Sequence, residues 1–116
     1  MISEPHPRVR QMLERLVVRL GHEVVTVQDP PTPAQLRSAD VFLVEPASRG
    51  VSLARTARVA NPSVAILCAG VALPPSELTQ LQPNLAGFVT KPFKPEQLGA
   101  AIQHALAHRD RLSATP

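Results

Sequence analysis

Two stretches near the ends of the chain repeat apolar residues at the spacing of an α-helix. Pro7 suits the first turn of one helix and Gly21 supplies a left-handed stop just after it. Its buried stripe would consist of Val9, Met12, Leu13, Leu16, Val17 and Leu20. The other stripe comprises Leu98, Ala101, Ile102, Ala105 and Leu106. The spacing therefore predicts one helix from Pro7 to Leu20 and another from Pro95 to about His108.

Four short apolar runs lie between these helices, at residues 23–27, 40–45, 63–69 and 87–91. Three of them are hardly interrupted by polar residues, which is typical of strands buried on both faces of a parallel sheet. Weaker helical patterns separate them at 33–38, 51–60 and 75–81. This alternation predicts an α/β fold in which right-handed crossovers place helices on both faces of a doubly wound parallel sheet.

Functional groups in such folds gather beyond the carboxyl ends of the strands. In this chain Glu45, Cys68 and Lys91 stand at those ends. We therefore look for the chemistry of the protein at that edge of the sheet.

The composition fits one compact domain with an aliphatic core. The chain has 116 residues, 44% of them hydrophobic, with three Phe and no Trp or Tyr. We expect one domain over residues 1–108 and a flexible polar tail over 109–116. The single cysteine excludes a disulfide within the chain and suits a reducing compartment. Without a signal peptide or a membrane-length apolar run, we expect a cytoplasmic protein with no membrane partner.

The formal net charge is +3, and arginines cluster at positions 8, 10, 15, 19, 109 and 111. Such a balance could favour an acidic partner or nucleic acid, but a solvated helix face explains it more simply. The histidines His6, His22, His104 and His108 lack a metal-binding spacing, and no glycine-rich phosphate loop occurs. We therefore expect no metal and no cofactor.

The segment Gly87-Phe-Val-Thr-Lys-Pro-Phe93, followed by a helix, resembles the last strand and helix of response-regulator receiver domains. Leu20-Gly-His-Glu-Val24 and the strand end Leu67-Cys-Ala69 resemble the same family. The resemblance runs from about Ser3 to Ala107. It implies a bacterial two-component signalling protein with a flavodoxin-like fold, in which five parallel strands in the order 2-1-3-4-5 are flanked by five helices.

The same resemblance implies a pocket in which a kinase phosphorylates an aspartate with the help of Mg²⁺. An acidic pair and the acceptor hold the metal, while a hydroxyl and a lysine bind the phosphoryl oxygens. In this chain Glu4 and Pro5 fall at the acidic pair, and Glu45 falls at the acceptor position. Cys68 replaces the hydroxyl, whereas Lys91 and the aromatic Phe88 match the family.

These departures predict a degenerate pocket. Proline offers no side-chain ligand, and the extra methylene moves the Glu45 carboxylate by roughly 1.5 Å into space that the phosphate would occupy. A thiol is a weak hydrogen-bond donor, and the loop after Glu45 is shortened and starts with Pro46. We therefore expect no phosphotransfer and no enzymatic activity.

The first strand is predicted to be truncated, because only Met1, Ile2 and Ser3 precede Glu4. The sheet could include this stub, be reorganised, or borrow pairing from a second chain. The sequence does not choose among these three arrangements.

Several side chains allow two interpretations. Lys91 and Glu45 could form a permanent ion pair that imitates an activated receiver, or a purely structural bridge. Cys68 is a redox sensor only if its thiol is exposed and its pKa is lowered, and burial in a strand favours an inert side chain. Packing is likewise favoured over a switch for Phe88. The resemblance also implies that Pro92 follows a cis peptide bond.

We therefore predict a pseudo-receiver that acts by protein–protein interaction, independently of phosphorylation. Its partner would be a kinase, an output protein, a scaffold or a second copy of the chain. The contact surface would comprise the fourth helix, fifth strand and last helix, including Phe88, Pro92, Phe93, Gln97, Gln103 and His104. Two alternatives stay open: an unusual phosphoacceptor using Glu45 or Glu4, and a nucleic-acid module using the arginines of the first helix.

Overall fold

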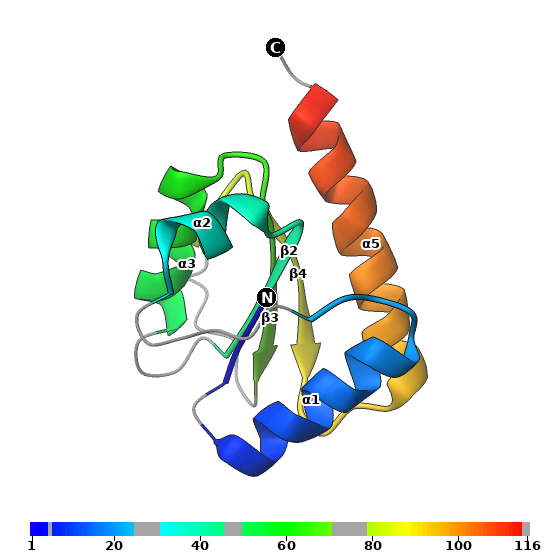
Figure 1. Cartoon of the computed structure of the whole chain (residues 1–116). Helices are drawn as coiled ribbons and strands as arrows, with labels where there is room; N and C mark the ends of the chain where they lie inside the picture. Colours follow the sequence, from blue (N-terminus) through cyan, green and yellow to red (C-terminus); the bar gives the residue numbers. More distant parts are fainter. Residues whose placement is uncertain (5, 25–30, 46–49, 71–78, 115–116) are drawn as a thin grey trace.

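The computed structural model describes residues 1–4, 6–24, 31–45, 50–70 and 79–114. Four parallel strands form one sheet in the order β1-β2-β3-β4 (Figure 1). The strands are β1 (Ile2–Ser3), β2 (Val41–Val44), β3 (Ala65–Gly70) and β4 (Leu85–Thr90). The helices are α1 (Pro7–Arg19), α2 (Pro33–Ser38), α3 (Gly50–Ala60) and α5 (Pro95–Ala114). No helix in these ranges is long and apolar enough to cross a membrane.

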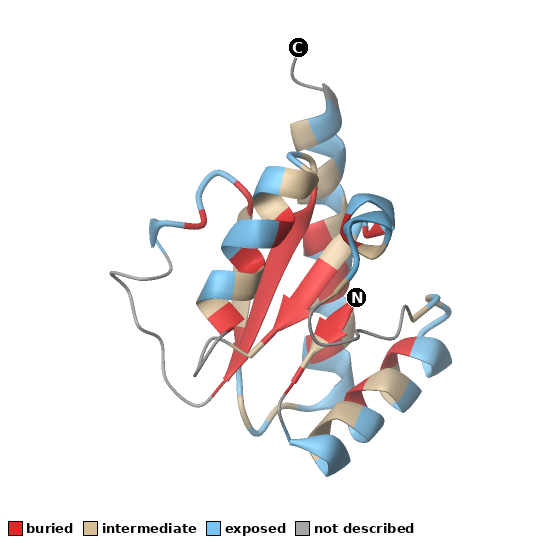
Figure 2. Ribbon diagram, turned by 60° about the vertical axis from the view of Figure 1, so that its left-hand side comes forward, coloured by how far each residue is buried: buried red, intermediate tan, exposed pale blue. Residues whose placement is uncertain are grey.

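Two apolar cores lie on opposite faces of the sheet because successive strand residues point to opposite faces. Phe42 and Val44 of β2 face α2 and α3, whereas Leu43 between them faces α1 and α5. Figure 2 shows the buried strands in red between helices whose outer sides are exposed. All six residues of β3 are buried, as the uninterrupted apolar run predicts.

The sequence locates most of these elements correctly. The helices predicted at 7–20, 33–38 and 51–60 are confirmed, and so are the strands predicted at 40–45, 63–69 and 87–91. The stripe of α1 is narrower than predicted, because Met12 and Leu20 are 52% and 38% exposed. Leu13 and Val17 form its buried centre.

The described residues allow only part of the predicted strand order 2-1-3-4-5 to be compared with the structure. The observed order corresponds to the first, third, fourth and fifth predicted strands. Most of the predicted second strand, and the predicted helix at 75–81 up to residue 78, lie outside the described residues. The complete order therefore stays a prediction.

The short first strand joins the sheet directly. Ile2 and Ser3 pair in parallel with Leu43 and Val44. The N–H groups of Leu43 and Glu45 donate to the carbonyls of Met1 and Ser3 at 2.8 and 3.0 Å. Of the three arrangements that the sequence left open, the described residues adopt the one in which the stub is included.

The last helix is longer than predicted. It continues to Ala114 instead of ending near His108, so the residues assigned to a tail from 109 onward are helical as far as 114 (Figure 1). No glycine or proline interrupts residues 100–114. Arg109 is also held by an ion pair of 2.8 Å with Asp40, and His108 Nε2 lies 2.7 Å from the Pro83 carbonyl.

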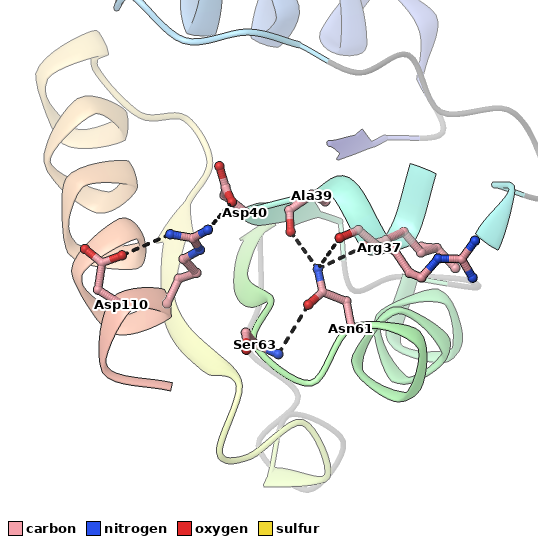
Figure 3. A network of polar contacts seen from close by, with 8 residues as sticks. Arg37, Ala39, Asp40, Asn61, Ser63 and Asp110 are labelled. Carbon is pink, nitrogen blue, oxygen red and sulfur yellow. Dashed lines mark hydrogen bonds and ion pairs between the residues drawn. The ribbon is translucent and has the colours of Figure 1, made fainter. Parts of the chain in front are cut away.

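Two asparagine side chains tie the amino ends of the elements together. Asn61, just after α3, donates from Nδ2 to the carbonyls of Leu36, Arg37 and Ala39, at 2.8 to 3.3 Å (Figure 3). Its Oδ1 accepts from the Ser63 N–H at 3.3 Å. The buried Asn84 donates to the carbonyls of Pro62 and Val64, both at 2.8 Å. These bonds fix the loops that precede β2, β3 and β4.

Candidate functional site

An ionic cluster stands at the carboxyl edge of the sheet. Lys91, directly after β4, places its ammonium between the carboxylates of Glu4 and Glu45, which directly follow β1 and β2. Nζ donates to Oε2 of Glu45 at 2.9 Å and to Oε1 of Glu4. Parallel strands bring their carboxyl ends to one edge, so three residues far apart in the sequence meet there.

Lys91 reaches these carboxylates across the end of β3, which lies between β4 and β2. Two strand spacings amount to about 9.6 Å, which an extended lysine of about 6 Å covers only together with a long carboxylate side chain. β3 ends in Cys68, Ala69 and Gly70, whose small side chains leave room for the lysine stem. The length of the Glu45 side chain thus suits contact with Lys91.

The cluster is largely removed from solvent. The exposed fractions of the side chains are 3% for Glu4, 13% for Glu45 and 20% for Lys91. Burial by itself lowers the pKa of Lys91, but its hydrogen bonds to Glu4 and Glu45 raise it, and the pKa ends above its ordinary value of 10.5. Lys91 is therefore a stable ammonium at neutral pH.

Cys68 lies inside β3 and is completely buried. Burial, together with the negative charge of Glu45, raises the pKa of its thiol to about 12. Neither condition for a redox sensor, an exposed thiol or a lowered pKa, is met. The structure favours the interpretation of Cys68 as an inert core residue.

The arrangement fits an internal ammonium better than a magnesium ion. Mg²⁺ requires near-octahedral oxygen ligands and binds through carboxylates. Here both carboxylates are bound to Lys91, and in the described part of the chain no three His, Cys, Asp or Glu side chains gather as a metal site. Pro5, at the second position of the expected acidic pair, lies outside the described residues.

The residues predicted for an interaction surface separate into two groups. Phe88 and Phe93 are half-buried and pack against the cores on opposite faces of the sheet. Pro92, Gln97, Gln103 and His104 are exposed. The Lys91–Pro92 peptide bond is cis, as predicted. Gln97 also accepts from the Lys94 N–H at 2.7 Å, which ties it to the start of α5.

The sequence predicts an ion pair between Lys91 and Glu45, but the contact of Lys91 with Glu4 was not predicted. The signal was present, because Glu4 directly follows the stub strand, whose carboxyl end had to share the edge with the others. The asparagine contacts of Asn61 and Asn84 were also missed. They depend on carbonyls from other segments, which no local motif indicates.

Comparison with known proteins identifies similar structures, but no match among family profiles or curated sequences. No protein-family profile matches the chain, and no curated protein matches its sequence. Among solved structures, the CheY-like receiver domain protein of Methanospirillum hungatei superposes with a TM-score of 0.77 at 15% identity, over 95% of this chain and 94% of that one. Vibrio cholerae CheY4 has a TM-score of 0.75 at 22% identity, over 90% and 95%.

NtrX of Brucella abortus, in complex with ADP, superposes with a TM-score of 0.79 at 16% identity. The match covers 95% of this chain but 26% of NtrX, so the chain spans about a quarter of that protein. Together with the parallel sheet and its flanking helices, these similarities show that the chain has the fold of response-regulator receiver domains.

Proposed function

We propose that this protein is a pseudo-receiver: a receiver-like domain of a two-component-type pathway that acts by binding another protein, independently of phosphorylation. The observation that carries the proposal is the Lys91 ammonium, which is bound by Glu4 and Glu45 at the edge where a receiver performs its chemistry. The domain itself would not be an enzyme.

Phosphotransfer requires a metal to neutralise the charge of the transferred group and a free carboxylate to accept it. Glu45 stands at the acceptor position, and its carboxylate is already bound by Lys91 at 2.9 Å. A magnesium ion would have to displace the ammonium from the buried carboxylate of Glu4 and the partly buried carboxylate of Glu45. The desolvated pair resists this, because separating its members leaves uncompensated buried charge.

Incubation with acetyl phosphate and Mg²⁺, followed by intact-mass measurement, tests the proposal against the phosphoacceptor alternative. We expect no added phosphate on the wild-type chain. Glu45→Gln and Glu4→Gln are the matched controls. A gain of one phosphate that Glu45→Gln abolishes would establish Glu45 as an acceptor and contradict the proposal.

The exposed positions Pro92, Gln97, Gln103 and His104 on and before α5 are the surface that we propose for the partner. A photo-crosslinking residue at Gln103, in cells of the source organism, tests it. The same residue at the exposed Thr56 of α3, in the opposite layer, is the control. We expect a crosslinked kinase, output protein, scaffold or second copy from position 103 only. Equal crosslinking from both positions would contradict the assignment.

Nucleic-acid binding is a second candidate, favoured by the exposed Arg8, Arg15 and Arg19 of α1. Within the described residues no ion pair is recorded for these three side chains. Titration of a labelled duplex at two salt concentrations tests this function. Steeply salt-dependent binding that Arg15→Glu and Arg19→Glu abolish would favour it over protein binding.

A further inference from the structure

We propose that Gly50 is a positioning residue, which holds the backbone of Glu45 so that its carboxylate meets Lys91. The inference rests on the proposed function, because it concerns how the ionic cluster is assembled. Gly50 is buried and is the first residue of α3. It lies five residues beyond Glu45, which directly follows β2.

The approach between Gly50 and Glu45 is too close for any other residue. A Cβ atom at position 50 would lie 1.7 Å from the Glu45 carbonyl oxygen and 2.7 Å from its carbonyl carbon. It would also lie 3.2 Å from Cγ2 of Val44. The first two atoms are backbone, so a rotation of a side chain cannot relieve the overlap.

Gly21, Gly87 and Gly99 have no such neighbour. A Cβ at Gly87 would come no closer than 3.7 Å to Leu67, and one at Gly99 no closer than 3.5 Å to Leu20. Both are ordinary van der Waals contacts. Gly21 has a φ of 93° and open space around it, so its requirement is conformational. The close approach of the Glu45 backbone thus distinguishes Gly50 from Gly21, Gly87 and Gly99.

The backbone of Glu45 is held on both sides. Its N–H donates to the Ser3 carbonyl of β1 at 3.0 Å, and its carbonyl rests against Gly50. A methyl group at position 50, 1.7 Å from the Glu45 carbonyl oxygen, would require a displacement of about 2 Å to reach ordinary contact. The hydrogen bond between Lys91 and Glu45, now 2.9 Å, would not survive a displacement of that size.

Glu45 is the side of this contact that would move, because α3 is fixed by its own packing. Ala54 and Ala57 of α3 are completely buried in the core. Arg58 of the same helix donates to the carbonyls of Gln80 and Gln82 at 2.7 and 2.8 Å. We therefore expect a larger residue at position 50 to displace the Glu45 backbone and to disturb the contact of its carboxylate with Lys91.

The titration of Lys91 in the Gly50→Ala variant tests this inference. The chain has two lysines, so a ¹³C-lysine label gives two signals, and the exposed Lys94 is an internal reference. We expect the pKa of Lys91 to fall from its wild-type value toward its ordinary value in Gly50→Ala. We expect no such fall in Gly87→Ala or Gly99→Ala. A folded Gly50→Ala variant with the wild-type pKa would overturn the inference.

Glu45→Asp gives a second test that does not depend on the folding of Gly50→Ala. If Gly50 holds the backbone of residue 45 in place, the shorter aspartate side chain cannot reach Lys91. The pKa of Lys91 then falls. If Lys91 kept its wild-type pKa in Glu45→Asp, the backbone of residue 45 would be free to move toward Lys91, and the inference would be overturned. Failure of the proposed function looks different: the wild-type protein would then gain a phosphate from acetyl phosphate and Mg²⁺, and Glu45→Gln would abolish that gain.

Discussion

The two edges of the sheet are built from different chemistry. At the carboxyl edge, Lys91 and two glutamates place charges in a largely buried cluster. At the amino edge, the neutral amide of Asn61 binds backbone carbonyls, and the ion pair of Arg109 with Asp40 is exposed (Figure 3). The neutral amide of Asn84 binds backbone carbonyls at the same edge. Neutral amides join segments at little desolvation cost, whereas a buried ionic cluster is stable only while all its members are present.

This difference indicates a division of roles. At the amino edge, the asparagine amides that hold three loops in place do not titrate. The carboxyl edge concentrates one ammonium and two carboxylates at the position where parallel sheets carry their function. Variants that remove one member of each arrangement measure how far this division holds.

Lys91→Met should have the largest effect, because it leaves the buried carboxylate of Glu4 and the partly buried carboxylate of Glu45 without their cation. We expect the free energy of unfolding to fall by about 3–5 kcal/mol at neutral pH, measured by urea denaturation. Lys94→Met, at an exposed lysine, is the control and should change it by less than about 0.5 kcal/mol. Equal losses of unfolding free energy in Lys91→Met and Lys94→Met would show that the ionic cluster does not stabilise the protein.

Asn84→Ala should follow in size. The variant leaves the carbonyls of Pro62 and Val64 without the donor they now share, at a site where the asparagine is 2% exposed. We expect a loss of about 2–3 kcal/mol in the same assay. Gln103→Ala on the exposed side of α5 serves for comparison. A loss as small as that of Gln103→Ala would contradict the role assigned to Asn84.

Cys68 should resist thiol reagents in the native protein at pH 8, because its thiol is buried and its pKa is raised to about 12. The unfolded thiol, with an ordinary pKa of 9.0, loses its proton first as the pH rises. Stability from this group is therefore complete below pH 9 and is lost toward pH 12. Denaturation at several pH values should show this slope, and Cys68→Ala should flatten it; an unchanged slope would contradict the assignment.

Arg109→Ala should have the smallest effect. Its ion pair with Asp40 involves side chains that are 38% and 57% exposed, and such pairs contribute about 0.2–1 kcal/mol. The change should appear mainly as faster amide hydrogen exchange over residues 109–114, with little change over 95–105. Uniform exchange along the whole helix would show that this pair does not anchor its last turns.

The sequence predicted the buried strands and the main helices because burial on both sheet faces leaves unbroken apolar runs, as in residues 63–69. It also placed Lys91 and Glu45 at one edge. It ended α5 too early, because the polar residues after His108 gave no apolar stripe. Their helix is instead supported by Arg109 on Asp40 and by His108 on Pro83.

Other features depend on contacts that local patterns do not encode. The contact of Gly50 with the Glu45 carbonyl depends on how closely the start of α3 approaches the end of β2, and the glycine alone does not reveal it. Similarly, Asn61 and Asn84 resemble ordinary loop residues in sequence. Their importance lies in carbonyls from other parts of the chain that the fold brings within reach.

The most direct test of the central claim is a titration of the ¹⁵N-labelled protein with Mg²⁺, in which the amide signals of Glu4, Glu45 and Lys91 are followed. Because the Lys91 ammonium already binds both carboxylates, we predict that these signals do not shift at millimolar Mg²⁺. Saturable shifts confined to these residues would show that the cation displaces the lysine, and would contradict the account.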